Sequence, residues 1–171
     1  MLHELSIIVP VYNAEKLILK LYENISKVDN SEIIFIDDGS SDNSFSILHE
    51  ISLLDTKVKV LHQSNNGPMH ARNYGLKHAT KPYVIFVDID DAIDTNFFKD
   101  RSYWMDFDIL VFSYFSERQK KVISKFDNGE YSSHDFLYYL SCSGGWELWG
   151  KIFKKSLFND ILIPVERLKA G

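Results

Sequence analysis

The chain has 171 residues, a formal net charge of −5 and 25% charged residues, which fits a single domain with its own hydrophobic core. Basic residues form no patch, so the composition disfavours a nucleic-acid-binding module, and no nucleic-acid partner is expected. The single cysteine, Cys142, excludes an intramolecular disulfide, and no apolar run approaches the roughly 20 residues that a membrane span needs.

Apolar runs and helical patterns alternate along the first hundred residues. Residues 5–10 form a β-branched run that ends at a proline, which predicts a buried strand. A helix is expected over residues 14–28, where Leu17, Leu21 and Ile25 recur at helical spacing. The same reasoning predicts strands over residues 32–36, 57–63 and 83–87, and helices over residues 45–54 and 69–78.

The helix expected over residues 45–54 carries an apolar stripe at every third position, formed by Phe45, Leu48, Ile51 and Leu54. Beyond residue 100 the pattern is less regular. A strand over residues 108–115 is expected to pair with one over residues 121–126. Short helices are predicted over residues 136–140, where Ser132 or Ser133 is the cap, and over residues 157–158.

The order of these elements predicts the fold class. Strand–helix alternation at this spacing is typical of βαβ units and a mostly parallel sheet, and apolar strands without alternation fit a sheet covered on both faces. We therefore expect an α/β fold, a Rossmann-type αβα sandwich. Turns rich in polar residues follow three of the strands, at residues 10–13, 37–40 and 88–91. We expect them to open on one edge, because ligands of such folds bind beyond the carboxyl ends of the strands.

The last of these turns is acidic, because the apolar residues 83–87 run straight into Asp88, Asp90 and Asp91. Burying unpaired carboxylates is very unfavourable, so the strand should end where they begin. Two or three carboxylate oxygens can hold Mg²⁺ or Mn²⁺ and leave positions for water and phosphate oxygens. Taken alone, the motif is equally compatible with a solvated Asp-rich turn.

Five motifs occur in a specific order along the chain. They are SIIVPVYN at residues 6–13, IDDGSSD at 36–42, NG at 66–67 with ARNYG at 71–75, DIDD at 88–91 and WGKIFKKSL at 149–157. Together they resemble the family 2 glycosyltransferases of GT-A fold, in their bacterial form. The resemblance covers nearly the whole chain. It implies one GT-A-like domain over residues 1–171, with a nucleotide-sugar-binding half at 1–100 and a partial acceptor-side half at 101–171.

The resemblance places the nucleoside of a donor near the first two turns. Pro10, Val11 and Tyr12 are expected to line the base pocket, with the Tyr12 ring packed on the base; a core tyrosine is the alternative. Asp38 is expected to accept a hydrogen bond from a base N–H, which favours the imide of uracil. The resemblance also implies that Gly67, in the turn that precedes the third helix, lines the nucleotide-sugar site.

The resemblance also assigns the phosphate end of the site. Arg72 is expected to engage a diphosphate or to order the acidic turn; a structural ion pair is the alternative. The family pattern makes Asp90 the direct ligand of a Mn²⁺ or Mg²⁺ cofactor. Asp88 is expected to contact the ribose or to bind the metal through water.

An inverting transfer needs a carboxylate that takes the proton from the acceptor hydroxyl. In the family this base lies in an acidic segment beyond the metal turn, and residues 165–171 resemble the approach to that segment. We therefore expect the chain to be truncated just before its catalytic base, which would lie beyond Gly171. Glu147 and Glu166 are the fallback candidates.

The implied function is transfer of a sugar, with inversion, from a UDP-linked nucleotide-diphospho-sugar to a glycan or lipid-linked sugar acceptor in cell-surface polysaccharide synthesis. The expected location is the cytoplasm or the inner face of the membrane. The alternative is a nucleotide-sugar-binding fragment that lacks the general base. A nucleotidyltransferase would need a Gly-rich basic loop after the first strand, and residues 10–13 do not supply one.

Overall fold

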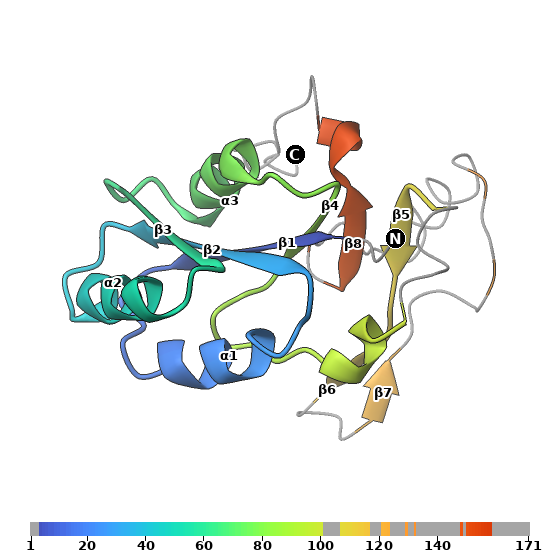
Figure 1. Ribbon diagram of the computed structural model, residues 1–171, viewed down its shortest axis with the longest axis horizontal. Helices are drawn as coiled ribbons and strands as arrows, with labels where there is room; N and C mark the ends of the chain where they lie inside the picture. Colours follow the sequence, from blue (N-terminus) through green and yellow to red (C-terminus); the bar gives the residue numbers. More distant parts are fainter. Residues whose placement is uncertain are drawn as a thin grey trace, which may run out of the picture.

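The computed structural model describes residues 4–100, 107–116, 121–123 and 150–158, together with residues 129, 132 and 148. Its centre is a six-stranded sheet of order β3-β2-β1-β4-β8-β5 (Figure 1). The strands of this sheet are β1 (Leu5–Val11), β2 (Ser31–Asp38), β3 (Val58–Gln63), β4 (Tyr83–Phe86), β5 (Ile109–Val111) and β8 (Lys151–Lys154). The first four strands are parallel to one another, and β8 runs antiparallel to both β4 and β5. The predicted mostly parallel sheet is confirmed.

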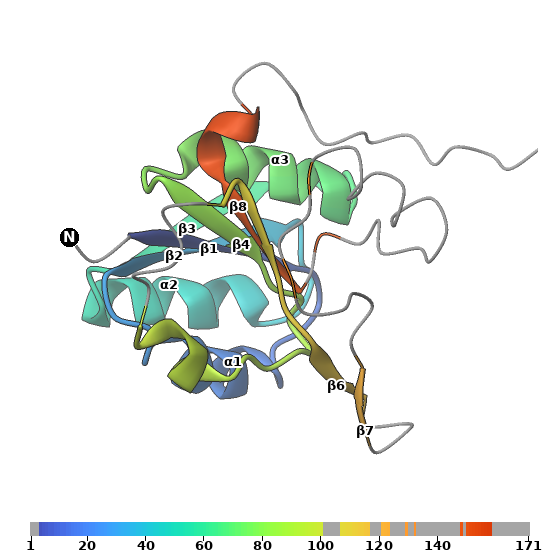
Figure 2. The same ribbon diagram turned by 90° about the vertical axis from the view of Figure 1, so that its right-hand side faces the viewer.

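Helices cover both faces of this sheet (Figures 1 and 2). The helices α1 (Ile18–Ile25) and α2 (Ser44–Leu54) lie on one face, and α3 (Pro68–His78) lies on the other. Successive strand residues point to opposite faces, so Phe35 packs in the cluster that includes α1 and α2, whereas Ile36 packs in the cluster that includes α3. The result is the αβα sandwich that the sequence predicts.

The centre of the sheet is a topological switch point. β1 pairs with β2 on one side and with β4 on the other, and the helices that lead to these two strands lie on opposite faces. Ligands of open α/β sheets bind in the crevice at such a point, beyond the carboxyl ends of the strands. The turns after β1, β2 and β4 lie at this edge, as expected.

The first helix is shorter than the predicted helix over residues 14–28, because α1 begins only at Ile18. The preceding residues are held instead by the turn after β2. Asn13 has a left-handed backbone with φ 49°, and Ala14 N–H donates to Ser44 Oγ at 2.9 Å. These contacts leave Leu17 outside the core at 37% exposure.

The apolar stripe of the second helix is only half buried. Leu48 and Ile51 are in the core, whereas Phe45 is 41% and Leu54 is 87% exposed. An α-helix has 3.6 residues per turn, so positions three apart drift steadily around the axis. The two ends of a stripe with strict three-residue spacing therefore turn away from the sheet.

The strand predicted over residues 108–115 is divided into β5 and β6 (Tyr114–Ser116). β6 pairs antiparallel with β7 (Lys121–Ile123), which confirms the predicted pairing. The described part also contains two 3-10 helices, η1 (Thr95–Phe98) and η3 (Lys155–Phe158); η3 contains the short helix predicted over residues 157–158. The helix predicted over residues 136–140 lies outside the described residues.

The strand β8, which fills the sheet between β4 and β5, is not among the elements predicted from the sequence. Its Ile152 and Phe153 are both buried and belong to the two different core clusters. Phe153 contacts Phe86 of β4 with ring centroids 6.1 Å apart. The WGKIFKKSL motif thus serves partly to extend the sheet beside the acidic turn.

Candidate functional site

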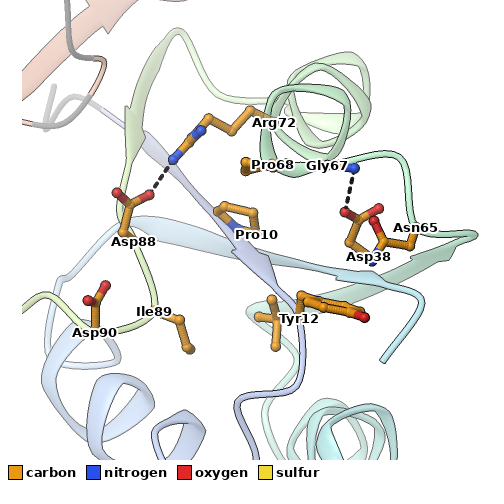
Figure 3. A pocket seen from close by; sticks show the side chains of 11 residues that line it. Pro10, Tyr12, Asp38, Asn65, Gly67, Pro68, Arg72, Asp88, Ile89 and Asp90 are labelled. Carbon is orange, nitrogen blue, oxygen red and sulfur yellow. Dashed lines mark hydrogen bonds and ion pairs between the residues drawn. The ribbon is translucent and has the colours of Figure 1, made fainter. Parts of the chain in front are cut away.

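A pocket of about 460 Å³ opens at the carboxyl edge of β1, β2 and β4 (Figure 3). The residues that line it are Pro10, Val11, Tyr12, Asp38, Asn65, Gly67, Pro68, Arg72, Asp88, Ile89 and Asp90. All of the residues predicted for the nucleotide-sugar and metal sites are among them. Asn65, Pro68 and Ile89 are additions that the sequence analysis did not assign; Asn65 and Pro68 adjoin the NG motif, and Ile89 lies within DIDD.

Tyr12 stands at the wall of the pocket because the residue after it turns sharply. The Asn13 side chain accepts a hydrogen bond from Ser41 N–H at 2.7 Å, and Asn13 N–H donates to Ser40 Oγ at 3.0 Å. These bonds tie the end of β1 to the turn after β2. Tyr12 itself is 52% exposed, so it is not a core tyrosine.

Asp38 lines the same pocket as Tyr12 (Figure 3). Its carboxylate accepts hydrogen bonds from Gln63 Nε2 at 2.7 Å, from Asn66 N–H at 3.0 Å and from Gly67 N–H at 2.8 Å. Charge-assisted bonds of this kind are stronger than those between neutral groups. Asp38 therefore fixes residues 63–67 against the end of β2.

The neighbouring Asp37 points to the opposite face of the sheet and does not line the pocket. It is fully buried, and its Oδ2 lies 2.8 Å from Nδ1 of His62 on β3. Ser40 N–H also contacts this oxygen at 3.4 Å. The two consecutive aspartates thus have different surroundings, and only Asp38 faces the cleft.

The acidic turn forms the other end of the pocket. Asp91 N–H donates to the Asp88 carbonyl at 3.0 Å, which closes the turn. Nη2 of Arg72, one turn into α3, forms an ion pair with Oδ1 of Asp88. Both partners line the pocket, so Arg72 orders the acidic turn within the site.

The donor set of this turn is compatible with a divalent cation. Desolvation of the Asp91 carboxyl group and the charges of Asp88 and Asp90 raise its pKa, and a bound cation would relieve this repulsion. Among the described residues, no three His, Cys, Asp or Glu side chains gather into a complete metal site. Mg²⁺ in phosphate chemistry is usually bound by one or two carboxylates together with phosphate oxygens and water. Asp90 and Asp88 fit that partial set.

The catalytic base is not placed by the structure. The fallback candidates Glu147 and Glu166 lie outside the described residues. So does Gly171, beyond which the sequence analysis expects the base, and the description of this end of the chain stops at residue 158. The position of the base therefore stays a prediction.

None of the helices in the described part of the chain has the length and apolar character that crossing a membrane requires.

Comparison with known proteins agrees with this architecture. Residues 6–160 match the family model described as Glycosyl transferase family 2. Glycosyltransferase GlyG of Streptococcus pneumoniae serotype 4 is 30% identical over an alignment that covers 92% of this chain and 58% of GlyG. TarS of Staphylococcus aureus, a poly(ribitol-phosphate) beta-N-acetylglucosaminyltransferase, is 37% identical over 59% of this chain and 18% of TarS. The chain thus spans less than two thirds of either relative.

Solved structures of S. aureus TarS 1–349 are also similar to this chain. The complex with UDP has a TM-score of 0.77 at 29% identity and covers 98% of this chain and 52% of that one. The complex with UDP-GlcNAc has a TM-score of 0.76 at 28% identity, over 94% of this chain and 48% of that one. The predicted GT-A fold is confirmed. Because the family model spans most of the sequence and GlyG aligns with nearly all of it, the chain belongs to glycosyl transferase family 2.

Proposed function

We propose that this chain binds a uridine-diphospho-sugar and belongs to an enzyme that transfers the sugar, with inversion, to a hydroxyl of a glycan or lipid-linked acceptor. The observation that carries the proposal is the make-up of a single pocket. An exposed aromatic ring and a carboxylate lie at one end, and an arginine with an acidic turn lies at the other (Figure 3). A nucleoside diphosphate has the complementary groups in the same order, with a base at one end and two phosphates at the other.

At the nucleoside end, Tyr12 offers a flat face on which a base can stack, and such stacking is typically favourable by about 1–3 kcal/mol. Asp38 offers an acceptor for the ring N–H of uracil. The TarS complexes with UDP and UDP-GlcNAc support uridine as the nucleoside. UDP-GlcNAc is therefore the first donor to test.

At the phosphate end, Asp90 and Asp88 would hold Mn²⁺ or Mg²⁺ together with the two phosphates. Such an ion offsets the charge that builds up on the departing diphosphate. Arg72 keeps Asp88 in place through their ion pair. This ion pair joins the acidic turn to α3. The guanidinium of Arg72 would therefore lie beside the phosphates of a bound donor and contribute positive charge there.

The base that deprotonates the acceptor stays a prediction. The name of TarS, whose acceptor is poly(ribitol-phosphate), supports a cell-surface polymer as the acceptor class, and we propose the same class for the full protein. If the chain binds UDP but neither hydrolyses nor transfers the sugar of any UDP-sugar, the binding-fragment alternative holds.

Calorimetric titration with UDP, with and without Mn²⁺, tests the proposal. We expect Mn²⁺ to strengthen UDP binding, because Asp90 would hold the ion and the ion would offset the negative charge of the diphosphate. In Asp90→Asn the gain from Mn²⁺ should disappear, whereas binding without the metal should stay at the wild-type level. The fold should be unchanged, because Asp90 is exposed at the edge of the sheet.

Asp94→Asn is the matched control. Asp94 lies four positions further along, is exposed and caps η1 through a bond from Asn96 N–H at 3.0 Å. Asparagine caps helices as well as aspartate does, so this variant should keep the full gain from Mn²⁺. UDP binding that is unaffected by Mn²⁺ in the wild-type chain, or by Asp90→Asn in its presence, would contradict the metal assignment.

A further inference from the structure

The three donors that surround Asp38 leave little room for a ligand on its carboxylate. Gln63 Nε2 and Asn66 N–H both donate to Oδ1, and Gly67 N–H donates to Oδ2. A carboxylate has about four lone-pair positions, two on each oxygen. Oδ1 is therefore filled, and Oδ2 keeps one position. Asp38 is 3% exposed and lines the pocket, so this position is the one that a bound base can use.

We propose that Gln63 is a positioning residue that makes this site selective for bases with a ring N–H. The inference rests on the proposed function, because it concerns the nucleoside of the same donor. Gln63 is the side-chain donor of the three, and the other two are backbone groups of the loop. By donating to Oδ1 together with Asn66 N–H, its amide holds the carboxylate in place and leaves one position on Oδ2 as the acceptor for a base.

The register of the sheet places Gln63 for this role. β2 and β3 pair so that Asp38 lies opposite Gln63, on the same face of the sheet. Gly39, the first residue after β2, has φ +72°, and a Cβ added there would lie 2.8 Å from Asn65 N and 3.3 Å from the Gln63 carbonyl. The turn after β2 and residues 63–67 are therefore in close contact, which leaves the Asp38 side chain little freedom as long as Gln63 holds it.

A fixed acceptor discriminates between pyrimidine bases. The N3 position of uracil carries a hydrogen and can donate to Oδ2. The N3 position of cytosine carries a lone pair, so a cytosine in the same pose would face the carboxylate with no hydrogen between them. Sites with a built-in polar partner reject analogues that lack the matching group. If the Asp38 carboxylate can rotate, the rejection of cytosine weakens, because Oδ2 can then turn away from the lone pair on cytosine N3.

The experiment compares the dissociation constants of UDP and CDP in the presence of Mn²⁺. Gln63→Met removes the amide donor at nearly constant length, and Gln63→Glu replaces the donor with an acceptor. Lys59→Met is the matched control. It removes another side-chain bond to a carboxylate across the same strand pair, the ion pair of Lys59 Nζ with Glu32 Oε2 at 2.6 Å, at the opposite end of the strands.

We expect the wild-type chain to prefer UDP. Both Gln63 variants should lower the ratio of the CDP to the UDP dissociation constant by about tenfold, the scale of one lost charge-assisted bond. Lys59→Met should lower the melting temperature, because it removes a bond to Glu32. It should leave the ratio of the two dissociation constants unaltered. A merely structural role of Gln63 would weaken both nucleotides equally and leave the ratio unchanged.

The outcomes separate this inference from the proposed function. Wild-type binding of UDP with an unchanged ratio in both Gln63 variants overturns the role of Gln63 and leaves the proposed function standing. Failure of the wild-type chain to bind UDP overturns the proposed function itself. Should Gln63→Met not fold, Gln63→Glu, which keeps the length and branching of the side chain but removes the donor, decides the matter alone.

Discussion

Tyr12 has an exposed ring, at 52% exposure, at the wall of the pocket. An aromatic side chain that contributes so little to the core is available for a ligand. In Tyr12→Ala we expect UDP binding to weaken by about 2 kcal/mol, or roughly thirtyfold, through lost base stacking. Titration with UDP measures the effect, and the melting temperature should change little.

Tyr12→Phe is the control for this substitution, because phenylalanine keeps the ring and loses only the hydroxyl. It should bind UDP nearly as well as the wild-type chain. Pyrophosphate, which has no base, should bind all three proteins alike. Wild-type affinity of Tyr12→Ala for UDP would place the base elsewhere.

The sequence predicts best where residues at or just beyond the ends of strands lie in the structure. Tyr12, Asp38 and Asp90 were assigned from short motifs, and the structure brings them to one pocket. Gln63 was not assigned, because its contact with Asp38 depends on the register between β2 and β3. A local pattern carries no signal for a cross-strand partner of this kind.

Among the described helices, α3 supplies the pocket residues Pro68 and Arg72, and its distance from the sheet depends on Gly75. A Cβ at this position would lie 2.7 Å from Ile36 Cδ1 and 2.7 Å from Ile8 Cγ2. We expect Gly75→Ala to destabilise the fold by about 1–2 kcal/mol, because overpacking outweighs the helix propensity that alanine gains. Urea unfolding monitored by circular dichroism measures the difference.

Ser46→Ala is the reference for this helix substitution. Ser46 is exposed on α2, so alanine there meets no neighbour and should raise stability by up to about 0.5 kcal/mol. A Gly75→Ala variant that is as stable as the Ser46→Ala variant would mean that α3 is free to move outward.

The predictions of secondary structure are most accurate in the first part of the chain, where apolar runs alternate with helical patterns. The apolar runs of β1, β2 and β4 are buried on both faces, and this leaves a clear pattern in the sequence. β8 lacks such a pattern, because two of its four residues are lysines. Its strand conformation depends on β4 and β5, which are distant in the chain. Tertiary contacts of this kind override local preference.

A buried polar network at the amino edge of the sheet connects several elements of the fold. Glu32 of β2 accepts hydrogen bonds from Ser6 Oγ at 2.7 Å, from Lys59 Nζ at 2.6 Å and from Thr80 Oγ1 at 2.9 Å. Burial alone would raise the pKa of Glu32, but these bonds outweigh it and lower the pKa to about 2. The network links β1, β2, β3 and the loop before β4.

The lowered pKa of Glu32 predicts a pH dependence of stability. A carboxyl group whose pKa is lower in the folded state stabilises the protein above its unfolded pKa of 4.5 and loses this contribution as the pH falls toward 2. The free-energy difference between the wild-type chain and Glu32→Gln should therefore shrink by about 2 kcal/mol between pH 7 and pH 3. Urea unfolding at the two pH values measures it.

Glu50→Gln, altered at an exposed carboxylate of α2, is the reference for removing one negative charge. If the difference in free energy of unfolding between the wild-type chain and Glu32→Gln stays constant between pH 7 and pH 3, the role given to this network is contradicted.

The central claim is that one pocket binds both ends of a uridine diphosphate. A crystal structure of the chain with UDP and Mn²⁺ tests it most directly. The account predicts that the uracil stacks on Tyr12 with N3–H bonded to Oδ2 of Asp38, and that Mn²⁺ lies between the diphosphate and Asp90. A nucleotide bound elsewhere, or a uracil out of reach of Asp38, would contradict it.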